Sequence, residues 1–358
     1  MYTRELIEHF AVRVNAVYTD FNQTLFILSV LDDSWEEREL KDRYRHIAHV
    51  LGATLPRDYG QAVGVLDQLA GESRGFPYMF FPEYIAMFGL PHWDLSVDAL
   101  RRYTVICSSE FAVRPFIEQD QQRMLAVMLE WAQDPDEHVR RLASEGCRPR
   151  LPWGKPLRSL IADPTPILPI LERLKADPSE YVRRSVANNL NDISKDHPQL
   201  VLSLASRWQG TDKGTDWIIK HACRTLLKKG EPEALRLFGF GDGDGNGQAS
   251  ALVEITGLTI TPASIRLGEE IRFSFRLSSP EPASFRLQFA VDYVKANGKT
   301  SPKRFHLPEH KQFCGTETVE KRLSFQDYTT RKHYPGEHRL AILVNGEEKA
   351  ATSFMVGE

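Results

Sequence analysis

The chain has 358 residues, of which 42% are hydrophobic and 26% charged, a balance typical of a globular protein with two or three domains. Its net charge of −3 excludes a chain that is basic throughout, although a single domain can still be basic. The four cysteines lie far apart and include no C-x-x-C pair, which argues against a disulfide framework, a zinc ribbon and an iron–sulfur cluster. The first residues form no signal-peptide-like apolar run, and no stretch approaches the length of a membrane span. We therefore expect a cytoplasmic protein with no membrane partner.

The first 238 residues are predicted to form helices that pack in pairs. Apolar residues recur there at the spacing of amphipathic helices, and Pro, Gly and Asp separate one window from the next. The clearest windows are 5–18, 35–51, 59–69 and 97–107. This pattern predicts an all-α domain over residues 1–238.

A repeated motif indicates how the helix pairs are arranged. The pattern D-P-x-E-x-V-R-R begins at Asp134 and again at Asp177, a displacement of 43 residues. This period is typical of HEAT-like helix pairs, which stack into a solenoid. In each copy we expect the Asp to be the N-cap of a helix and the Pro to occupy the first helical position.

Helical spacing assigns the residues after each motif to an apolar and a polar face. The expected core stripe consists of Val139, Leu142, Ala143 and Gly146. The polar face carries Arg141, Glu145 and Arg148 in the first copy and Arg184, Asn188 and Asp192 in the second. Because Arg141 and Arg184 occupy equivalent positions in the two copies, they should stack when the repeats pack together. Glu145 should likewise stack with Asn188, so that successive repeats build one polar wall.

Two further segments extend this wall. Upstream, Glu110 and Arg114 have a spacing similar to that of Glu145 and Arg148. Downstream, a later predicted helix contributes Lys220. Residues 138–190 hold ten Lys or Arg against five acids, a local charge of +5. Two interpretations stay open: a solvated face held by ion pairs within helices, or a surface along the concave side of the solenoid that binds a polyanion.

Two acids and one aromatic residue are candidates for chemistry. Glu145 lies between two arginines and Asp192 lies near a helix end, with a structural ion pair and a turn residue as the respective alternatives. Trp153 lies in L-P-W-G-K-P, which cannot be a helix interior. Its indole is therefore expected either to stack on a sugar or base or to pack in the core. The sequence contains no nucleophile elbow, Walker loop or H-E-x-x-H, and no spacing calls for a metal ion or cofactor.

The composition changes at Gly239, after which residues 239–251 are Gly-rich and predicted to be a linker. Asp242, Asp244 and Asn246 are spaced as at the start of a calcium loop, but Val253 replaces the bidentate acid, so a plain linker is favoured. Residues 252–358 then predict about seven short strands and hence a small β-sandwich. The clearest strands are Val253–Thr261, Ile271–Leu277, Phe285–Tyr293, Thr316–Phe325 and Arg339–Val344.

Five segments together resemble the AlkC branch of the AlkC/AlkD DNA alkylation-repair glycosylases, which are built of HEAT-like repeats. They are F-P-Y-M-F-F-P (76–82), S-S-E-F-A-V-R-P-F (108–116), R-R-L-A-S-E-G (140–146), R-L-P-W (150–153) and V-R-R-S-V-A-N-N-L-N-D (182–192). The C-terminal segment resembles the immunoglobulin-like module appended in one AlkC subgroup, which implies a role in binding DNA. The resemblance implies an all-α HEAT-like solenoid followed by an immunoglobulin-like β-sandwich.

The resemblance also implies an activity. Members hydrolyse the N-glycosidic bond of cationic N3-alkylated bases, 3-methyladenine and, in the AlkC branch, 3-methylcytosine, without base flipping. Because no lysine of this sequence stands out as a Schiff-base nucleophile, we expect a monofunctional glycosylase that leaves an abasic site. The implied catalytic residues are Glu110, Glu145, Trp153 and Asp192. The implied DNA contacts are Arg114, Arg141, Arg148, Arg150, Lys155, Arg184, Asn188 and Lys220.

The expected partner is double-stranded DNA containing alkylated bases, bound by a monomer in the bacterial cytoplasm or nucleoid, with no cofactor and no metal. Two alternative functions are consistent with the same residues. The protein could be a HEAT-repeat module that binds DNA without catalysis, or a scaffold that binds other proteins.

Overall fold

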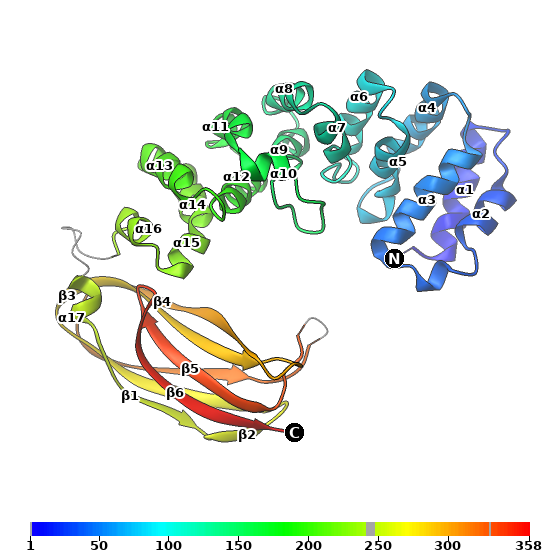
Figure 1. Ribbon diagram of the computed structural model, residues 1–358. Helices are drawn as coiled ribbons and strands as arrows, with labels where there is room; N and C mark the ends of the chain where they lie inside the picture. The colour runs from blue at the N-terminus through cyan, green and yellow to red at the C-terminus, as the bar shows by residue number, and fades with distance from the viewer. Residues whose placement is uncertain (1, 241–247, 329–330) are drawn as a thin grey trace. The chain divides into compact units, whose positions relative to one another are not determined.

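The structure is a computed structural model, shown in Figure 1, and it describes residues 2–240, 248–328 and 331–358. The chain divides into two compact units, one formed by Met1–His197 with Trp208–Ala222 and the other by Pro198–Arg207 with Cys223–Glu358. The domain boundary expected near residue 238 stays a prediction. The calcium-loop alternative falls on 241–247, outside the described residues.

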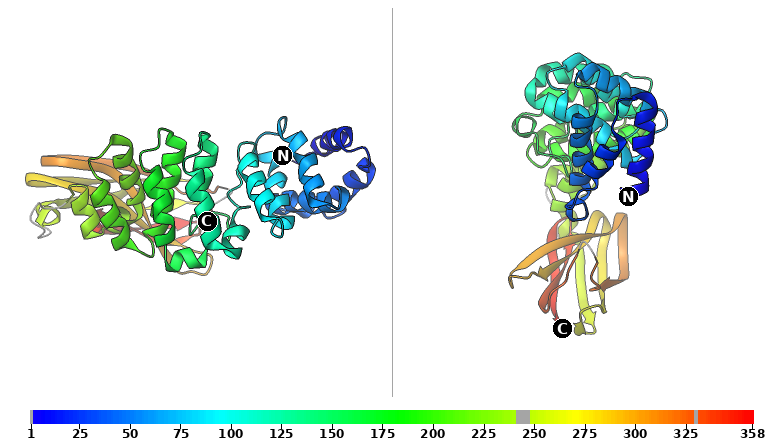
Figure 2. Two further views of the ribbon diagram at one scale, coloured as in Figure 1. Left: turned by 90° about the horizontal axis from the view of Figure 1, so that it is seen from above. Right: turned by 90° about the vertical axis from the view of Figure 1, so that its right-hand side faces the viewer.

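The first unit is a row of helices that follow one another in chain order (Figures 1 and 2). Neighbouring helices pack in pairs, among them α9 with α12 and α12 with α14. The helices of this unit are α1 (Arg4–Val17), α2 (Gln23–Val30), α3 (Leu40–Thr54), α4 (Tyr59–Ala70), α5 (Phe80–Phe88), α6 (Trp93–Tyr103), α7 (Arg114–Gln119), α8 (Gln121–Trp131), α9 (Glu137–Glu145), α10 (Arg158–Ala162), α11 (Leu168–Leu174), α12 (Glu180–Ile193) and α14 (Lys213–Ala222). Three short 3₁₀ turns lie at Trp35–Glu37, Phe76–Tyr78 and Thr165–Ile167.

The aspartates of the repeated motif link successive repeats. The prediction that they are N-caps is wrong, because the Asp134 side chain accepts from the N–H of Asp136 (2.9 Å) in a turn that precedes the helix, and Asp136 is the cap of α9. Asp134 instead binds Nε of Arg101 at 2.7 Å, and Asp177 binds Nε of Arg140 at 2.7 Å. Each aspartate thus binds an arginine of an earlier helix, which fixes the register between repeats.

The described residues of the second unit include a β-domain built from one sheet of six strands: β1 (Glu254–Thr261), β2 (Ser264–Arg266), β3 (Glu270–Val294), β4 (Thr300–Ser324), β5 (Gly336–Val344) and β6 (Glu347–Gly357). The strand order is β1-β3-β5-β6-β2, and β4 pairs with β3. Two of the expected strands are merged in β3, whose first half pairs with β1 and whose second half pairs with β5. Because β1 also contacts β6, the sheet nearly closes around a core of aromatic and aliphatic side chains.

Short helices complete the second unit: α13 (Pro198–Trp208), α15 (Arg224–Lys229), α16 (Pro232–Leu237) and α17 (Gln248–Leu252). Side chains of β4 bind the carbonyl ends of two of them. Arg304 donates to Lys228 O at 2.9 Å, and Lys311 donates to Phe238 O at 2.7 Å. The predicted fold class, a helical repeat domain followed by an immunoglobulin-like β-domain, is confirmed. No helix in the described part of the chain is long and apolar enough to cross a membrane.

Candidate active site

Helices α9 and α12 bring two acids of the predicted polar wall to one arginine. Arg148, just beyond α9, donates from Nη1 to Glu145 Oε1 (2.7 Å) and from Nε to Asp192 Oδ2 (2.8 Å). These three side chains are 4–7% exposed. Lys195 donates to the other oxygen of Asp192 at 2.9 Å. Glu145 and Asp192 therefore belong to one buried site.

Small residues between α9 and α12 allow this close approach. Ser185 Oγ donates to Glu145 Oε2 at 2.5 Å and lies 3.0 Å from Ser144 Oγ. Asn189 Nδ2 donates to Ser144 O at 2.8 Å. At the end of α9, a Cβ on Gly146 would lie only 2.5 Å from a side-chain carbon of Val113, the residue before α7, so a larger residue would force a neighbour to shift. The helix contact thus holds the Glu145 carboxylate in one position.

A second arginine connects this site to Glu110. Arg141 Nη1 donates to Glu110 Oε2 at 2.8 Å, and Arg141 Nη2 lies 3.4 Å from Glu145 Oε1. We use the name charge chain for the six residues that alternate in sign along this path, Glu110, Arg141, Glu145, Arg148, Asp192 and Lys195. The structure brings together the three acids that the sequence singled out.

The electrostatics of the charge chain hold its arginines in the charged form. Burial opposes the charge of Arg148, but the attraction of Glu145 and the hydrogen bond to Asp192 raise its pKa above the ordinary value. Burial also opposes the charge of Arg141, and the attraction of Glu145 and Glu110 likewise raises its pKa. Each arginine therefore balances two carboxylates at once.

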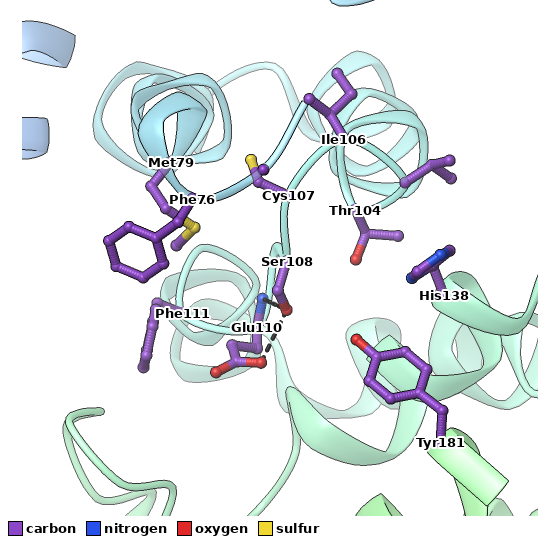
Figure 3. Close-up of a pocket in the computed structure, with 12 residues that line it drawn as sticks. Phe76, Met79, Thr104, Ile106, Cys107, Ser108, Glu110, Phe111, His138 and Tyr181 are labelled. Atoms are coloured by element: carbon purple, nitrogen blue, oxygen red, sulfur yellow. Dashed lines mark hydrogen bonds between the residues drawn. The ribbon is translucent and has the colours of Figure 1, made fainter. Parts of the chain in front are cut away.

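Glu110 also borders a pocket of about 300 Å³, shown in Figure 3. Phe76 and Phe111 lie on one side of it and His138 and Tyr181 on the other, with Glu110 between them. The rings of His138 and Tyr181 pack edge to face with centroids 5.5 Å apart. The pocket offers aromatic surface beside a carboxylate.

Trp153 stands on the loop between α9 and α10, which projects from the helix row (Figure 1). The residue is 72% exposed, so the alternative in which it packs in the core is wrong. Its backbone is left-handed, with φ +64°. Lys41 on α3 donates to its carbonyl oxygen. The loop therefore presents an indole to solvent.

Three of the exposed residues predicted to contact DNA are each paired with an acid. Arg150 binds Asp196 at 2.8 Å, Lys155 binds Glu118 at 2.9 Å and Arg184 binds Glu180 at 2.6 Å. Lys220 is exposed and Asn188 is half-buried.

Three other predicted DNA contacts lie elsewhere than expected. Arg141 and Arg148 are enclosed in the charge chain, and Arg114 is only 4% exposed and binds backbone carbonyls. Arg184, which was expected to stack with Arg141, pairs with Glu180 on its own helix. The guanidinium of Arg141 lies instead over the ring of Tyr181, 4.8 Å from its centroid.

Sequence reasoning missed several polar neighbours of the site. Lys195 follows Asp192 by three residues, the spacing of helix neighbours, which would have been a usable signal. Ser185 and Lys41 gave no such signal, because their contacts are with distant parts of the chain. Within the described ranges, no three His, Cys, Asp or Glu side chains are grouped so that they could hold a metal ion.

Comparisons with known proteins place this chain in a family. Residues 102–226 match a family model described as DNA alkylation repair enzyme, and residues 254–358 match one described as the C-terminal immunoglobulin-like domain of YhaZ. The uncharacterized protein YhaZ of Bacillus subtilis (strain 168) is 45% identical over 357 residues, which cover 99% of this chain and 98% of YhaZ.

A solved structure is similar over the same length. The alkylpurine DNA glycosylase AlkC of Pseudomonas fluorescens, bound to DNA containing an abasic site analog, has 42% sequence identity and a TM-score of 0.93, and the match covers 99% of this chain and 98% of AlkC. Identity at this level along the whole chain shows common descent. The chain belongs to the AlkC family of DNA alkylation-repair glycosylases and carries the immunoglobulin-like C-terminal domain of YhaZ.

Proposed function

We propose that the protein is a monofunctional DNA glycosylase that excises cationic N3-alkylated bases, 3-methyladenine and 3-methylcytosine, from double-stranded DNA. The observation that carries this proposal is the charge chain, in which Glu145 and Asp192 share Arg148 close to a loop that exposes Trp153. A surface that only binds phosphates gains nothing from such carboxylates. A glycosylase requires them.

The substrate supplies part of the activation. Alkylation at N3 gives the base a positive charge, so the base departs as a neutral molecule when the N-glycosidic bond breaks. Positive charge then develops on the deoxyribose, and a fixed carboxylate stabilises it. A second carboxylate positions the water that attacks the sugar carbon and accepts its proton. No lysine is required as a nucleophile, so an abasic site is the product.

We assign these two tasks to Asp192 and Glu145. Glu145 accepts hydrogen bonds from Arg148 and Ser185 and Asp192 from Arg148 and Lys195, so both carboxylates are fixed before substrate binds. Preorganisation of this kind removes the need to reorient dipoles during the reaction. Glu110 supports the pair through Arg141.

Trp153 and the exposed basic residues complete the proposed interface. The face of the Trp153 indole attracts the cationic sugar as it forms. Arg150, Lys155 and Arg184 contact the phosphates on either side of the lesion, and the lesion is recognised without being flipped out of the helix.

A DNA-binding module without catalysis is the second candidate. It is favoured by the complete pairing of Glu145 and Asp192 with cations, an arrangement that also suits a structural network.

Base release separates the two candidates. Release of 3-methyladenine and 3-methylcytosine from methylated duplex DNA is measured for the wild type, Glu145→Gln and Asp192→Asn under single-turnover conditions. We expect each variant to lose activity by about 10²–10³-fold while it still binds DNA, because each removes charge that stabilises the transition state.

Asp196→Asn is the matched control, since Asp196 pairs with Arg150 at the surface and should be dispensable for the chemical step. A wild-type protein that binds the DNA tightly and releases neither base would contradict the glycosylase proposal.

A further inference from the structure

Arg114, the first residue of α7, is a buried cation whose ligands are backbone carbonyls. Its Nη1 donates to Gly146 O and to Arg148 O, both at 2.9 Å. Its Nη2 and Nε donate to Lys155 O at 2.5 and 3.1 Å. The residue is 4% exposed. A planar guanidinium is suited to this task, because its donors have fixed directions and reach several acceptors at once.

These carbonyls lie at the two ends of one loop. Gly146 and Arg148 follow α9, and Gly146, the C-cap, has a terminal carbonyl that lacks an intrahelical partner and carries partial negative charge. Lys155 lies at the other end, before α10. Arg114 therefore ties the exit of α9 to the entry of α10.

The loop between these ends carries Trp153. Two bonds inside it, from Gly154 N–H to Leu151 O (3.0 Å) and from Leu157 N–H to Pro149 O (3.1 Å), give it a defined backbone. Because the indole is largely exposed, its position is set by this backbone more than by side-chain packing. The left-handed φ of Trp153 is unfavourable for a side chain of this size, so the surrounding bonds must maintain it.

The same arginine also fixes the charge chain. Arg148 binds both Glu145 and Asp192 through its side chain, while its own carbonyl is held by Arg114. A displacement of the Arg148 backbone would move its guanidinium relative to both carboxylates.

We propose that Arg114 is a positioning residue of the glycosylase reaction, which holds Trp153 and Arg148 in place from beneath the DNA-facing surface and does not itself contact DNA. This inference rests on the proposed function of the site. It replaces the phosphate contact that the sequence suggested for Arg114 by a contact with the protein backbone.

The primary test compares Arg114→Lys with the wild type. Lysine keeps the positive charge, but its single ammonium group cannot donate to the same three carbonyl oxygens that the planar guanidinium reaches. We expect single-turnover base release at saturating DNA to fall by at least about tenfold, while any change in the Kd that follows from a looser position of Arg150 and Lys155 leaves its salt dependence unchanged. A direct phosphate contact predicts instead that Arg114→Gln, which removes the charge, weakens the Kd at every DNA sequence and reduces the salt dependence by about one unit of slope.

A double-mutant cycle with Trp153→Ala distinguishes positioning from general destabilisation. If Arg114 acts through the loop, Arg114→Lys should lower the rate much less in the Trp153→Ala background than in the wild type. Equal losses in the two backgrounds would overturn the positioning of Trp153, because they would show that the effect of Arg114 does not pass through the indole.

Hydrogen exchange supplies a measurement that needs no activity. In Arg114→Lys, and in Arg114→Gln if the lysine variant does not fold, amides of residues 147–156 should exchange at least about tenfold faster, with the other helices unaffected. Unchanged exchange in the loop of a folded variant would contradict the proposal. Should the wild type release no base, the glycosylase function fails while this measurement still decides whether Arg114 holds the loop.

Arg13→Lys is the matched control. Arg13 also binds a helix carbonyl, donating to Leu69 O at 2.7 Å at the end of α4, but it does not contact the Trp153 loop. It should leave base release and the exchange of residues 147–156 unchanged. A loss of activity as large as that of Arg114→Lys would show that any such arginine matters equally, and the proposal would be wrong.

Discussion

Trp153 combines an exposed indole with a backbone conformation that residues other than glycine rarely adopt. The left-handed conformation costs a non-glycine residue about 1–2 kcal/mol, and the exposed ring returns little packing energy. A residue that lowers stability without filling the core is typical of a functional surface.

Trp153→Gly should therefore separate stability from activity. We expect its free energy of unfolding to equal that of the wild type or to exceed it by up to about 1 kcal/mol, because glycine adopts positive φ without strain. Base release should fall, since no ring remains to face the sugar. Chemical denaturation and single-turnover assays measure the two effects. A marked loss of stability would show that the indole packs against the protein and is not reserved for DNA.

At the same scale, the sequence predicted some positions and missed others for physical reasons. Glu145 and Arg148 share a helix face at three-residue spacing, and the repeat period placed Asp192 on the neighbouring helix, so their meeting was predictable. The burial of Arg114 was not, because its acceptors lie 32–41 residues further along the chain. The exposure of Trp153 could not be predicted either. Two prolines and a glycine indicate a loop, but they do not determine the direction of the Trp153 side chain.

At the scale of elements, the contact between α9 and its neighbours depends on the absence of a side chain at Gly146. A Cβ there would lie 2.5 Å from Val113 Cγ2 and 3.0 Å from Met128 Cε, both in the core. The end of α9 carries Glu145, so any shift that relieves this overlap displaces a proposed catalytic group.

Gly146→Ala is expected to destabilise the protein by about 1–3 kcal/mol, the range for an overpacked core, and to slow base release. Denaturant titration measures the first effect. The control is Gly64→Ala in α4, where an added Cβ would meet nothing within 4 Å. That substitution should stabilise the protein by about 0.5–1 kcal/mol, because alanine is the better helix former. Equal effects of the two substitutions would contradict the tight contact at α9.

Most of the helical region was predictable because amphipathic spacing and the repeat period are local signals. The start of α9 was misplaced, because the Asp134 side chain bonds to the backbone two residues later and delays the helix. The fusion of two expected strands into β3 had no local signal, since the segment between them contains prolines that usually end a strand.

At the scale of the whole molecule, the β-domain buries histidines in its core. His338 is fully buried, and its ring packs against those of Phe325 and Phe354 with centroids 5.2 and 5.5 Å apart. Burial lowers the pKa of His338 below its ordinary value, and burial together with the neighbouring Arg331 lowers that of His333. Both are therefore neutral in the folded domain at pH values where a free histidine is charged.

The stability of the β-domain should consequently decrease in acid. In the unfolded chain a histidine gains a proton near pH 6.5, so the free energy of unfolding is unaffected well above that pH and falls as the pH drops below it. Thermal unfolding between about pH 7.5 and 5.5 tests this. His338→Gln should reduce the slope of Tm against pH, and the exposed His9→Gln should not. An identical slope in the wild type and His338→Gln would contradict the assignment.

The exposed basic residues proposed to meet DNA are already bound to acids of the same chain, Arg150 to Asp196, Lys155 to Glu118 and Arg184 to Glu180. Binding a phosphate at any of them is then an exchange of one anion for another. Each displaced carboxylate would recruit a cation from solution while the DNA sheds its own counterions. The number of ions released would then be smaller than the number of phosphates contacted. The affinity for DNA would therefore depend less steeply on salt concentration than it would for a protein whose basic residues are unpaired. Binding to undamaged DNA during the search for a lesion would remain weak and reversible.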